Sequence, residues 1–303
     1  MIYQIRHLTR YSYALPVTTT HSELRLTPRE LGWQHLVRSV ITVEPQFETM
    51  RGFRDYFGNA VRYCSVLTPH RELAITAESI VEVRETNPLM PAATPDWEQV
   101  RNAVRAFDDP VALPAFEFVA ESRYVRWTPE IANYALASFT PQRPILEAAV
   151  DLSSRVHRDF KYKPESTDID TSVEDVFRNR RGVCQDFAHL LIAMLRAQGL
   201  PARYVSGYLR SGSVGAEASH AWVGVFVPGH GWVDLDPTND VVVDTNHITL
   251  AWGRDYGDVT PMKGINLGGG DHTIKVEVRV DPLAAVPPPV EIRRPAVRRW
   301  DRV

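Results

Sequence analysis

The sequence has little cysteine, little net charge and no long apolar run. Two cysteines in 303 residues exclude a disulfide scaffold and a four-cysteine zinc site. The 34 Lys+Arg and 37 Asp+Glu residues leave a formal net charge of −3, which argues against a nucleic-acid binder that works by charge. No window approaches about 18 consecutive apolar residues, so we expect no membrane span.

The N-terminus, Met1-Ile2-Tyr3-Gln4-Ile5-Arg6-His7, lacks the basic-then-apolar pattern of a secretory signal. We therefore expect a cytoplasmic protein with reduced cysteines. The composition, 44% hydrophobic and 23% charged, is that of a soluble globular protein, and an enzyme is the default class. At about 150 residues per domain, the length predicts about two domains.

Residues 1–86 read as an N-terminal β domain, an antiparallel sheet or sandwich. Polar and larger residues alternate at period two over residues 3–13, and three further strands are predicted over 36–43, 61–67 and 73–83. Residues 87–158 read as a helical region that opens with a Pro- and Ala-rich linker. Its predicted helix starts are Thr94-Pro95, Thr128-Pro129 and Thr140-Pro141.

From residue 159 to 282, helix and strand alternate, and we treat this stretch as one core region. A helix is predicted over 184–198, because its apolar residues recur at i, i+3, i+4 and i+7. Strands are predicted over 202–209, 221–227, 232–235 and 274–280. Residues 283–303 form a Pro/Arg-rich tail that we expect to be disordered. The predicted fold class is α+β.

Cys184 occupies the position expected of a reactive thiol. It begins a predicted helix, where unpaired N–H groups and the helix dipole favour a thiolate, and Arg180 and Arg181 act in the same direction. The preceding Gly182 allows close backbone approach by a substrate. Cys64, in the middle of a predicted strand, reads as a buried hydrophobic residue.

A nucleophilic thiol needs a base, and the base needs an orienting acceptor. His189 lies five positions along the same helix, about 140° round its axis, so we expect a structural role for it. His220 opens the first strand of a predicted hairpin, and Asp236 ends the returning strand. A loop of three or five residues would put both on one face as direct or diagonal neighbours, whereas an even loop would separate them.

Three segments together resemble the transglutaminase-like core: Arg181-Gly182-Val183-Cys184-Gln185-Asp186-Phe187-Ala188, Ser219-His220-Ala221-Trp222-Val223 and Gly231-Trp232-Val233-Asp234-Leu235-Asp236-Pro237-Thr238. The N-terminal region, with Phe57-Gly58-Asn59, is similar to the β region of bacterial transglutaminase-like proteins. The resemblance covers most of residues 1–280 and leaves the tail outside.

The resemblance implies a papain-like arrangement, with the Cys184 helix packed on an antiparallel sheet that carries His220 and Asp236. It implies that Cys184 attacks an amide carbonyl of a peptide or protein, and that the thioester passes to water or to an amine. We favour hydrolysis, because the calcium-regulated crosslinking enzymes carry domains that this chain lacks. The alternatives are an acyl- or acetyltransferase with the same triad and a non-catalytic binding or scaffold protein.

The second oxyanion donor stays open among Tyr162, Gln185 and Trp222. An acidic cluster lacks the glycine and ligand spacing of a calcium loop, and we interpret it as helix capping: Asp168, Asp170, Glu174 and Asp175. The sequence therefore predicts no cofactor and no metal. It predicts a peptide or protein substrate, no nucleic acid and no membrane partner, and leaves the oligomeric state open.

Overall fold

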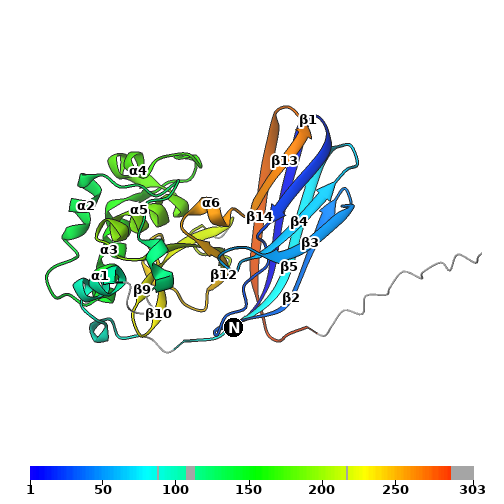
Figure 1. Ribbon diagram of the computed structural model, residues 1–303. Coiled ribbons are helices and arrows are strands. Elements are labelled where there is room, and N and C mark those ends of the chain that lie inside the picture. The colour runs from blue at the N-terminus through cyan, green and yellow to red at the C-terminus, as the bar shows by residue number, and fades with distance from the viewer. Residues whose placement is uncertain (87–88, 107–112, 216–217, 288–303) are drawn as a thin grey trace, which may run out of the picture.

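The structure is a computed structural model that describes residues 1–86, 89–106, 113–215 and 218–287. A tall β domain stands beside a body in which helices cover a second sheet (Figure 1). This is the α+β class predicted from the sequence. No helix in the described part of the chain is long and apolar enough to cross a membrane.

The β domain is built around one long strand. Along the first half of β1, Tyr3, Ile5, His7 and Thr9 are buried while their neighbours are more exposed, as period-two alternation requires. The sheet order is β2-β5-β1-β4-β3. The strands from this part of the chain are β1 (Ile2–Leu24), β2 (Gln34–Glu44), β3 (Thr49–Arg54), β4 (Ala60–Val66) and β5 (His70–Val83).

Two strands from the far end of the sequence complete this sheet. β13 (Met262–Gly268) and β14 (His272–Leu283) both pair antiparallel with β1, and the β14 register runs from Ile2 opposite Leu283 to Tyr13 opposite His272. The structure therefore differs from the predicted division into 1–86 and 159–282, because residues 262–283 belong to the β domain. The tail predicted from 283 lies outside the described residues from 288 onward.

In the described parts of the helical region, 89–106 and 113–158, there are three α-helices and two 3-10 turns. Thr128 caps α2 as predicted, since its side chain accepts a hydrogen bond from the Ile131 N–H at 3.5 Å. The Thr94 hydroxyl instead donates to the Pro91 carbonyl and accepts from the Leu146 N–H, so α1 starts later. The elements are η1 (Pro91–Ala93), α1 (Trp97–Ala106), η2 (Leu113–Phe118), α2 (Pro129–Leu136) and α3 (Ile145–Asp159).

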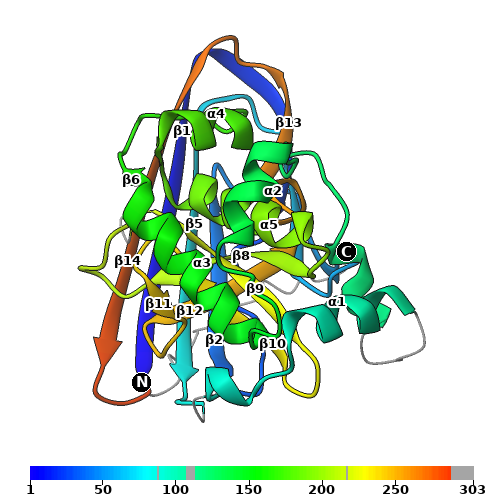
Figure 2. The same ribbon diagram turned by 90° about the vertical axis from the view of Figure 1, so that its left-hand side faces the viewer.

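In the core, helix α5 packs against a five-stranded antiparallel sheet of order β11-β10-β9-β8-β12. Figure 2 shows α2, α3 and α5 in front of β8 and β9. The strands are β8 (Ala202–Leu209), β9 (His220–Val227), β10 (Gly231–Asp236), β11 (Val241–Val242) and β12 (His247–Gly253). The remaining elements are β6 (Lys161–Tyr162), α4 (Val173–Asn179), β7 (Arg181–Gly182), α5 (Cys184–Ala197) and α6 (Tyr256–Val259).

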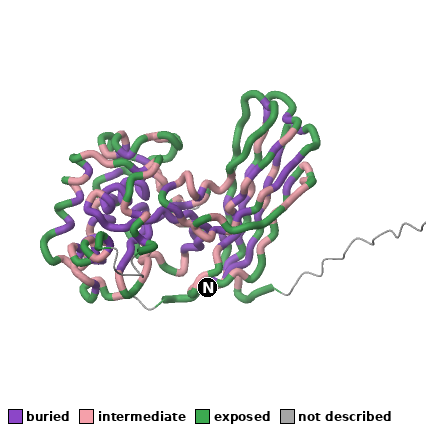
Figure 3. The backbone as a smooth tube through the Cα atoms, in the orientation of Figure 1, coloured by how far each residue is buried: buried purple, intermediate pink, exposed green. Residues whose placement is uncertain are grey.

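Hydrogen bonds join the β domain to the core sheet. The Gln34 amide bridges the backbone of Thr249 on β12, donating to its carbonyl and accepting from its N–H, both at 2.8 Å. His7 of β1 bonds the Tyr208 hydroxyl of β8 at 2.8 Å. Buried residues continue from the core into the lower half of the β domain, whereas its upper tip is mostly exposed (Figure 3). The two bodies therefore share one packed interface.

Candidate active site

Cys184 is the first residue of α5, and a carboxylate orders the turn before it. The Asp186 Oδ2 atom accepts hydrogen bonds from the Val183 N–H at 2.8 Å and from the Thr167 hydroxyl at 2.6 Å. As the first helical residue, Cys184 has an N–H with no acceptor inside the helix. The side chain of Cys184 is half-buried. The turn therefore presents a partly exposed thiol beside a backbone N–H.

Gly182 and Arg180, beside this turn, have further contacts. The group that approaches Gly182 is the Asp186 side chain: a Cβ at residue 182 would lie 2.8 Å from both Cβ and Oδ2 of Asp186. Arg180 ends α4 in the left-handed conformation, and its guanidinium stacks on the rings of Tyr134, Phe160 and Phe177. The Arg180 guanidinium is therefore held over aromatic rings at the end of α4.

The predicted hairpin brings His220 and Asp236 together. Three residues join β9 to β10, and Leu235 lies opposite Val223, so Asp236 and His220 are diagonal neighbours on one face. The His220 Nε2 atom lies 2.8 Å from Asp236 Oδ2, and both side chains are fully buried. This is the geometry that an odd hairpin loop predicts.

The second ring nitrogen of His220 is left for Cys184. Because Nε2 is engaged by Asp236, Nδ1 is the ring nitrogen that stays open, and it is buried with no hydrogen-bond partner within the described ranges. Burial alone lowers the pKa of His220. The charge of nearby Cys184 and the hydrogen bond to Asp236 outweigh burial and raise that pKa to about 10. The three predicted triad residues therefore lie at one site.

Asp236 is held ionised by several donors. Burial raises the pKa of its carboxyl group, but hydrogen bonds and charge from His220 and His247 hold that pKa well below its usual range. The Thr238 N–H donates to Oδ1 at 2.8 Å, and the Asn239 amide donates to Oδ2 at 2.7 Å. Such a carboxylate can orient an imidazole without taking its proton.

Tyr162 lies at the same site. Its strand β6 pairs in parallel with β7, with Tyr162 opposite Gly182, two residues before Cys184. A Cβ at Gly215 would lie 2.9 Å from His220 Nδ1 and 3.5 Å from the Tyr162 hydroxyl, so both groups line the same small space. The structure thus places the Tyr162 hydroxyl near His220, and its role as an oxyanion donor stays a prediction.

The other two candidate donors differ in their positions. Gln185 follows Cys184 on α5 and is partly exposed. Trp222 is fully buried, and its indole N–H donates to Asp234 Oδ2 at 3.2 Å. We therefore remove Trp222 from the candidate donors, because the N–H group of its side chain already donates to Asp234 inside the core.

The residues expected to be structural behave as such. His189 Nε2 accepts from the Tyr256 N–H at 3.1 Å, and burial lowers the pKa of His189 to about 3. The acidic cluster makes local contacts: Ser172 caps α4 toward Asp175, and Arg178 pairs with Glu174. Among the residues that the structure describes, no group of three His, Cys, Asp or Glu side chains could hold a metal ion.

Sequence reasoning missed His247, which lies 3.3 Å from Asp236 Oδ2 through its Nε2 atom. The residue begins β12, and no local motif marks it.

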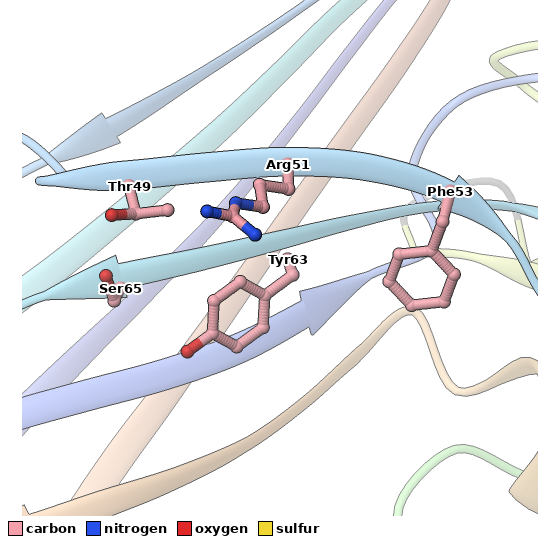
Figure 4. Close-up of a pocket in the computed structure, with 5 residues that line it drawn as sticks. All are labelled: Thr49, Arg51, Phe53, Tyr63 and Ser65. Carbon is pink, nitrogen blue, oxygen red and sulfur yellow. The ribbon is translucent and has the colours of Figure 1, made fainter.

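A hollow of about 400 Å³ lies away from the candidate site, on the face that β3 and β4 share (Figure 4). It is lined by Thr49, Arg51, Phe53, Tyr63 and Ser65, and none of these residues belongs to the triad.

Comparison with known proteins identifies the family of this chain. The bacterial transglutaminase-like N-terminal region matches residues 3–82, and the transglutaminase-like superfamily matches residues 133–237, which include the three triad positions. The chain belongs to the transglutaminase-like superfamily. A Mycobacterium tuberculosis protein of uncharacterized function is 40% identical over 92% of this chain and 91% of its own length. A Mycobacterium leprae relative, also uncharacterized, is 35% identical over 93% and 99%.

Two further similarities concern this transglutaminase-like chain. The crystal structure of a candidate cysteine protease from Cytophaga hutchinsonii superimposes with a TM-score of 0.73 at 22% identity, covering 95% of this chain and 93% of that one. This likeness shows the shared fold. A Pseudomonas aeruginosa protein-glutamine gamma-glutamyltransferase is 35% identical over 96 residues, which are 28% of this chain and 14% of that protein.

Proposed function

We propose that this transglutaminase-like protein is a cysteine enzyme that cleaves amide bonds of peptides or proteins through a thioester on Cys184. The observation that carries the proposal is the buried His220 ring, which Asp236 engages on Nε2 while Nδ1 stays open and the charge of nearby Cys184 acts on the ring. A thiol, a base and an orienting carboxylate in this order are the parts that nucleophilic acyl transfer needs.

The proposed cycle follows from the atoms in place. His220 Nδ1 takes the thiol proton, and the Cys184 sulfur attacks the amide carbonyl carbon. The resulting imidazolium donates from Nε2 to Asp236 and from Nδ1 to the leaving amine nitrogen, so the C–N bond breaks and a thioester remains. A water molecule then gives a proton to Nδ1 and hydrolyses the thioester, which restores the thiol.

The developing oxyanion needs donors that are in place before the reaction. We assign the backbone N–H of Cys184, which has no acceptor inside its helix, as the first donor. The Tyr162 hydroxyl is the second, since it lies beside the space that His220 lines. Gln185 is the alternative second donor, and Tyr162→Phe compared with Gln185→Ala separates the two by the loss of kcat.

Water is the proposed acceptor because it needs no binding site, whereas an amine acceptor needs a surface that binds it and excludes water. Transfer to an amine is the second candidate, and the local similarity to the Pseudomonas aeruginosa gamma-glutamyltransferase favours it. The two candidates share every step up to the thioester. They differ only in what attacks it.

The test is mass spectrometry of a peptide mixture incubated with the enzyme, with and without a primary amine. We expect new peptide termini with the wild type and none with Cys184→Ala. Amine adducts would select the transferase, and a +1 Da change on glutamine would select deamidation. Iodoacetamide labelling supplies the control, because burial raises the pKa of Cys64 to about 11. If Cys184 labels no faster than Cys64 at pH 7, the proposed function is wrong.

A further inference from the structure

A second imidazole lies on the carboxylate of the proposed triad. His247 Nε2 is 3.3 Å from Asp236 Oδ2, the same oxygen that lies 2.8 Å from His220 Nε2. The other nitrogen of His247, Nδ1, is 3.0 Å from Asp244 Oδ1. His247 is 5% exposed. Two buried histidines and two carboxylates thus alternate in a line that ends at Cys184.

This geometry sets the protonation state of His247. Each ring nitrogen faces a carboxylate oxygen, and ionised carboxylates only accept hydrogen bonds, so both nitrogens must carry a proton. In the neutral alternative, Nδ1 would accept from the Asp244 N–H at 3.4 Å. That arrangement would point its lone pair at an Asp244 oxygen only 3.0 Å away. The doubly protonated ring is therefore the consistent one.

The charged surroundings agree with a cation at this position. Burial lowers the pKa of His247, but hydrogen bonds and charge from Asp236 and Asp244 outweigh it and raise the pKa. The hydrogen bond from His247 helps to lower the pKa of Asp244 to about 2. The titratable groups around this pair are His220 across Asp236, with Cys184 beyond it, and Tyr3 with Arg210 on the Asp244 side. The edge of the Trp222 ring packs on His247.

We propose that His247, held by Asp244, is a positioning residue that keeps a positive charge behind the catalytic pair and sets the pH range over which Cys184 is a thiolate. This inference rests on the proposed function of Cys184, His220 and Asp236. The charge acts through Asp236, whose negative charge it partly neutralises, and it does not touch the substrate.

The sign of the effect follows from electrostatics. A positive charge near the pair favours the thiolate over the thiol and disfavours the protonated His220. Removal of that charge by His247→Gln therefore moves both limbs of the pH profile to higher pH. Since both Nε2 atoms contact one oxygen of Asp236, at 2.8 and 3.3 Å, they lie at most about 6 Å apart, and we expect a shift of about one pH unit.

The test is the rate of iodoacetamide labelling of Cys184 against pH, alongside the pH profile of turnover. His7→Gln is the matched control: His7 is also buried with both ring nitrogens bonded, but to the hydroxyls of Tyr208 and Thr9. We expect a shift of both limbs to higher pH in His247→Gln and none in His7→Gln. An unshifted His247→Gln profile with a reactive Cys184 overturns the inference and leaves the proposed function standing.

Nitrogen NMR of the imidazoles provides a second readout that needs no substituted His247. We expect both ring nitrogens of His247 to carry protons at pH 7 in the wild type. In Asp244→Asn, loss of the carboxylate lowers the pKa of His247, and its second proton should be lost at lower pH. A neutral His247 ring at pH 7 in the wild type overturns the inference, whether or not His247→Gln folds.

Discussion

Gly215 is where a single methyl group tests the geometry of the catalytic pair. The residue has φ +82° and lies in the loop between β8 and β9. A Cβ added there would lie 2.9 Å from His220 Nδ1 and 3.4 Å from its Cε1 atom. Because ordinary contacts of this kind are about 3.4 Å or longer, the imidazole or the loop must move by about half an ångström in Gly215→Ala.

Gly212→Ala provides the matched control in the same loop. Gly212 has φ +99°, and no described atom lies within 4 Å of its added Cβ. Both substitutions carry the cost of a left-handed alanine, about 1–2 kcal/mol. Only Gly215→Ala displaces the atom that takes the thiol proton, and a misplacement of about 1 Å costs on the order of 10²-fold in rate. We expect a loss of about 10- to 100-fold in Gly215→Ala.

The assay compares the two variants in kcat/KM and in the rate of iodoacetamide labelling of Cys184 at pH 7. Labelling needs no known substrate, so it reports directly on the thiolate and its imidazole. Thermal unfolding of both variants measures the shared backbone cost. If Gly215→Ala and Gly212→Ala label and turn over equally fast, the loop does not contact His220 as the structure has it.

Three further predictions concern the same elements. Asp236→Asn should reduce turnover by about 10⁴-fold with the fold retained, measured as kcat beside a circular dichroism spectrum, because the amide no longer holds the imidazolium. Gly182→Ala should lower the free energy of unfolding by about 1–3 kcal/mol in urea, since its Cβ overlaps Asp186, whereas Gly32→Ala meets no described atom and should be neutral. In the folded protein the pKa of His220 is about 10, above its usual value, so the protonated ring stabilises the folded state. This stabilisation is complete below about pH 6.5 and is lost as the pH rises toward 10. The urea midpoint should fall over that range, and less so in Cys184→Ala; equal falls would contradict the role of the thiolate.

The pairing of His220 with Asp236 was predictable because it depends on local rules. Strand side chains alternate, so the parity of a short hairpin loop decides which residues share a face. Residues 228–230 form a three-residue connection, and His220 and Asp236 lie together as that parity requires. The apolar period over residues 184–198 likewise predicted α5, which spans Cys184–Ala197.

The missed features depend on contacts between distant segments. Nothing in the pattern of residues 274–280 shows that this strand pairs with residues 2–13, because alternation predicts a strand and not its partner. The same holds for His247, whose importance comes from meeting Asp236 across the sheet. The sequence left the role of Trp222 open, because an indole N–H can donate to a substrate or to a neighbouring side chain. Only the folded structure shows that it donates to Asp234.

The β domain reaches the candidate site through one loop. The Ser211 N–H donates to the Val280 carbonyl of β14 at 3.1 Å, and the Val280 N–H donates to the Ser211 hydroxyl at 2.9 Å. Four residues later the same loop packs Gly215 against His220. Since β14 pairs with β1 along most of its length, β1 and β14 together hold the loop that contacts His220. The β domain is therefore part of how the imidazole is positioned, although every triad residue lies in the core.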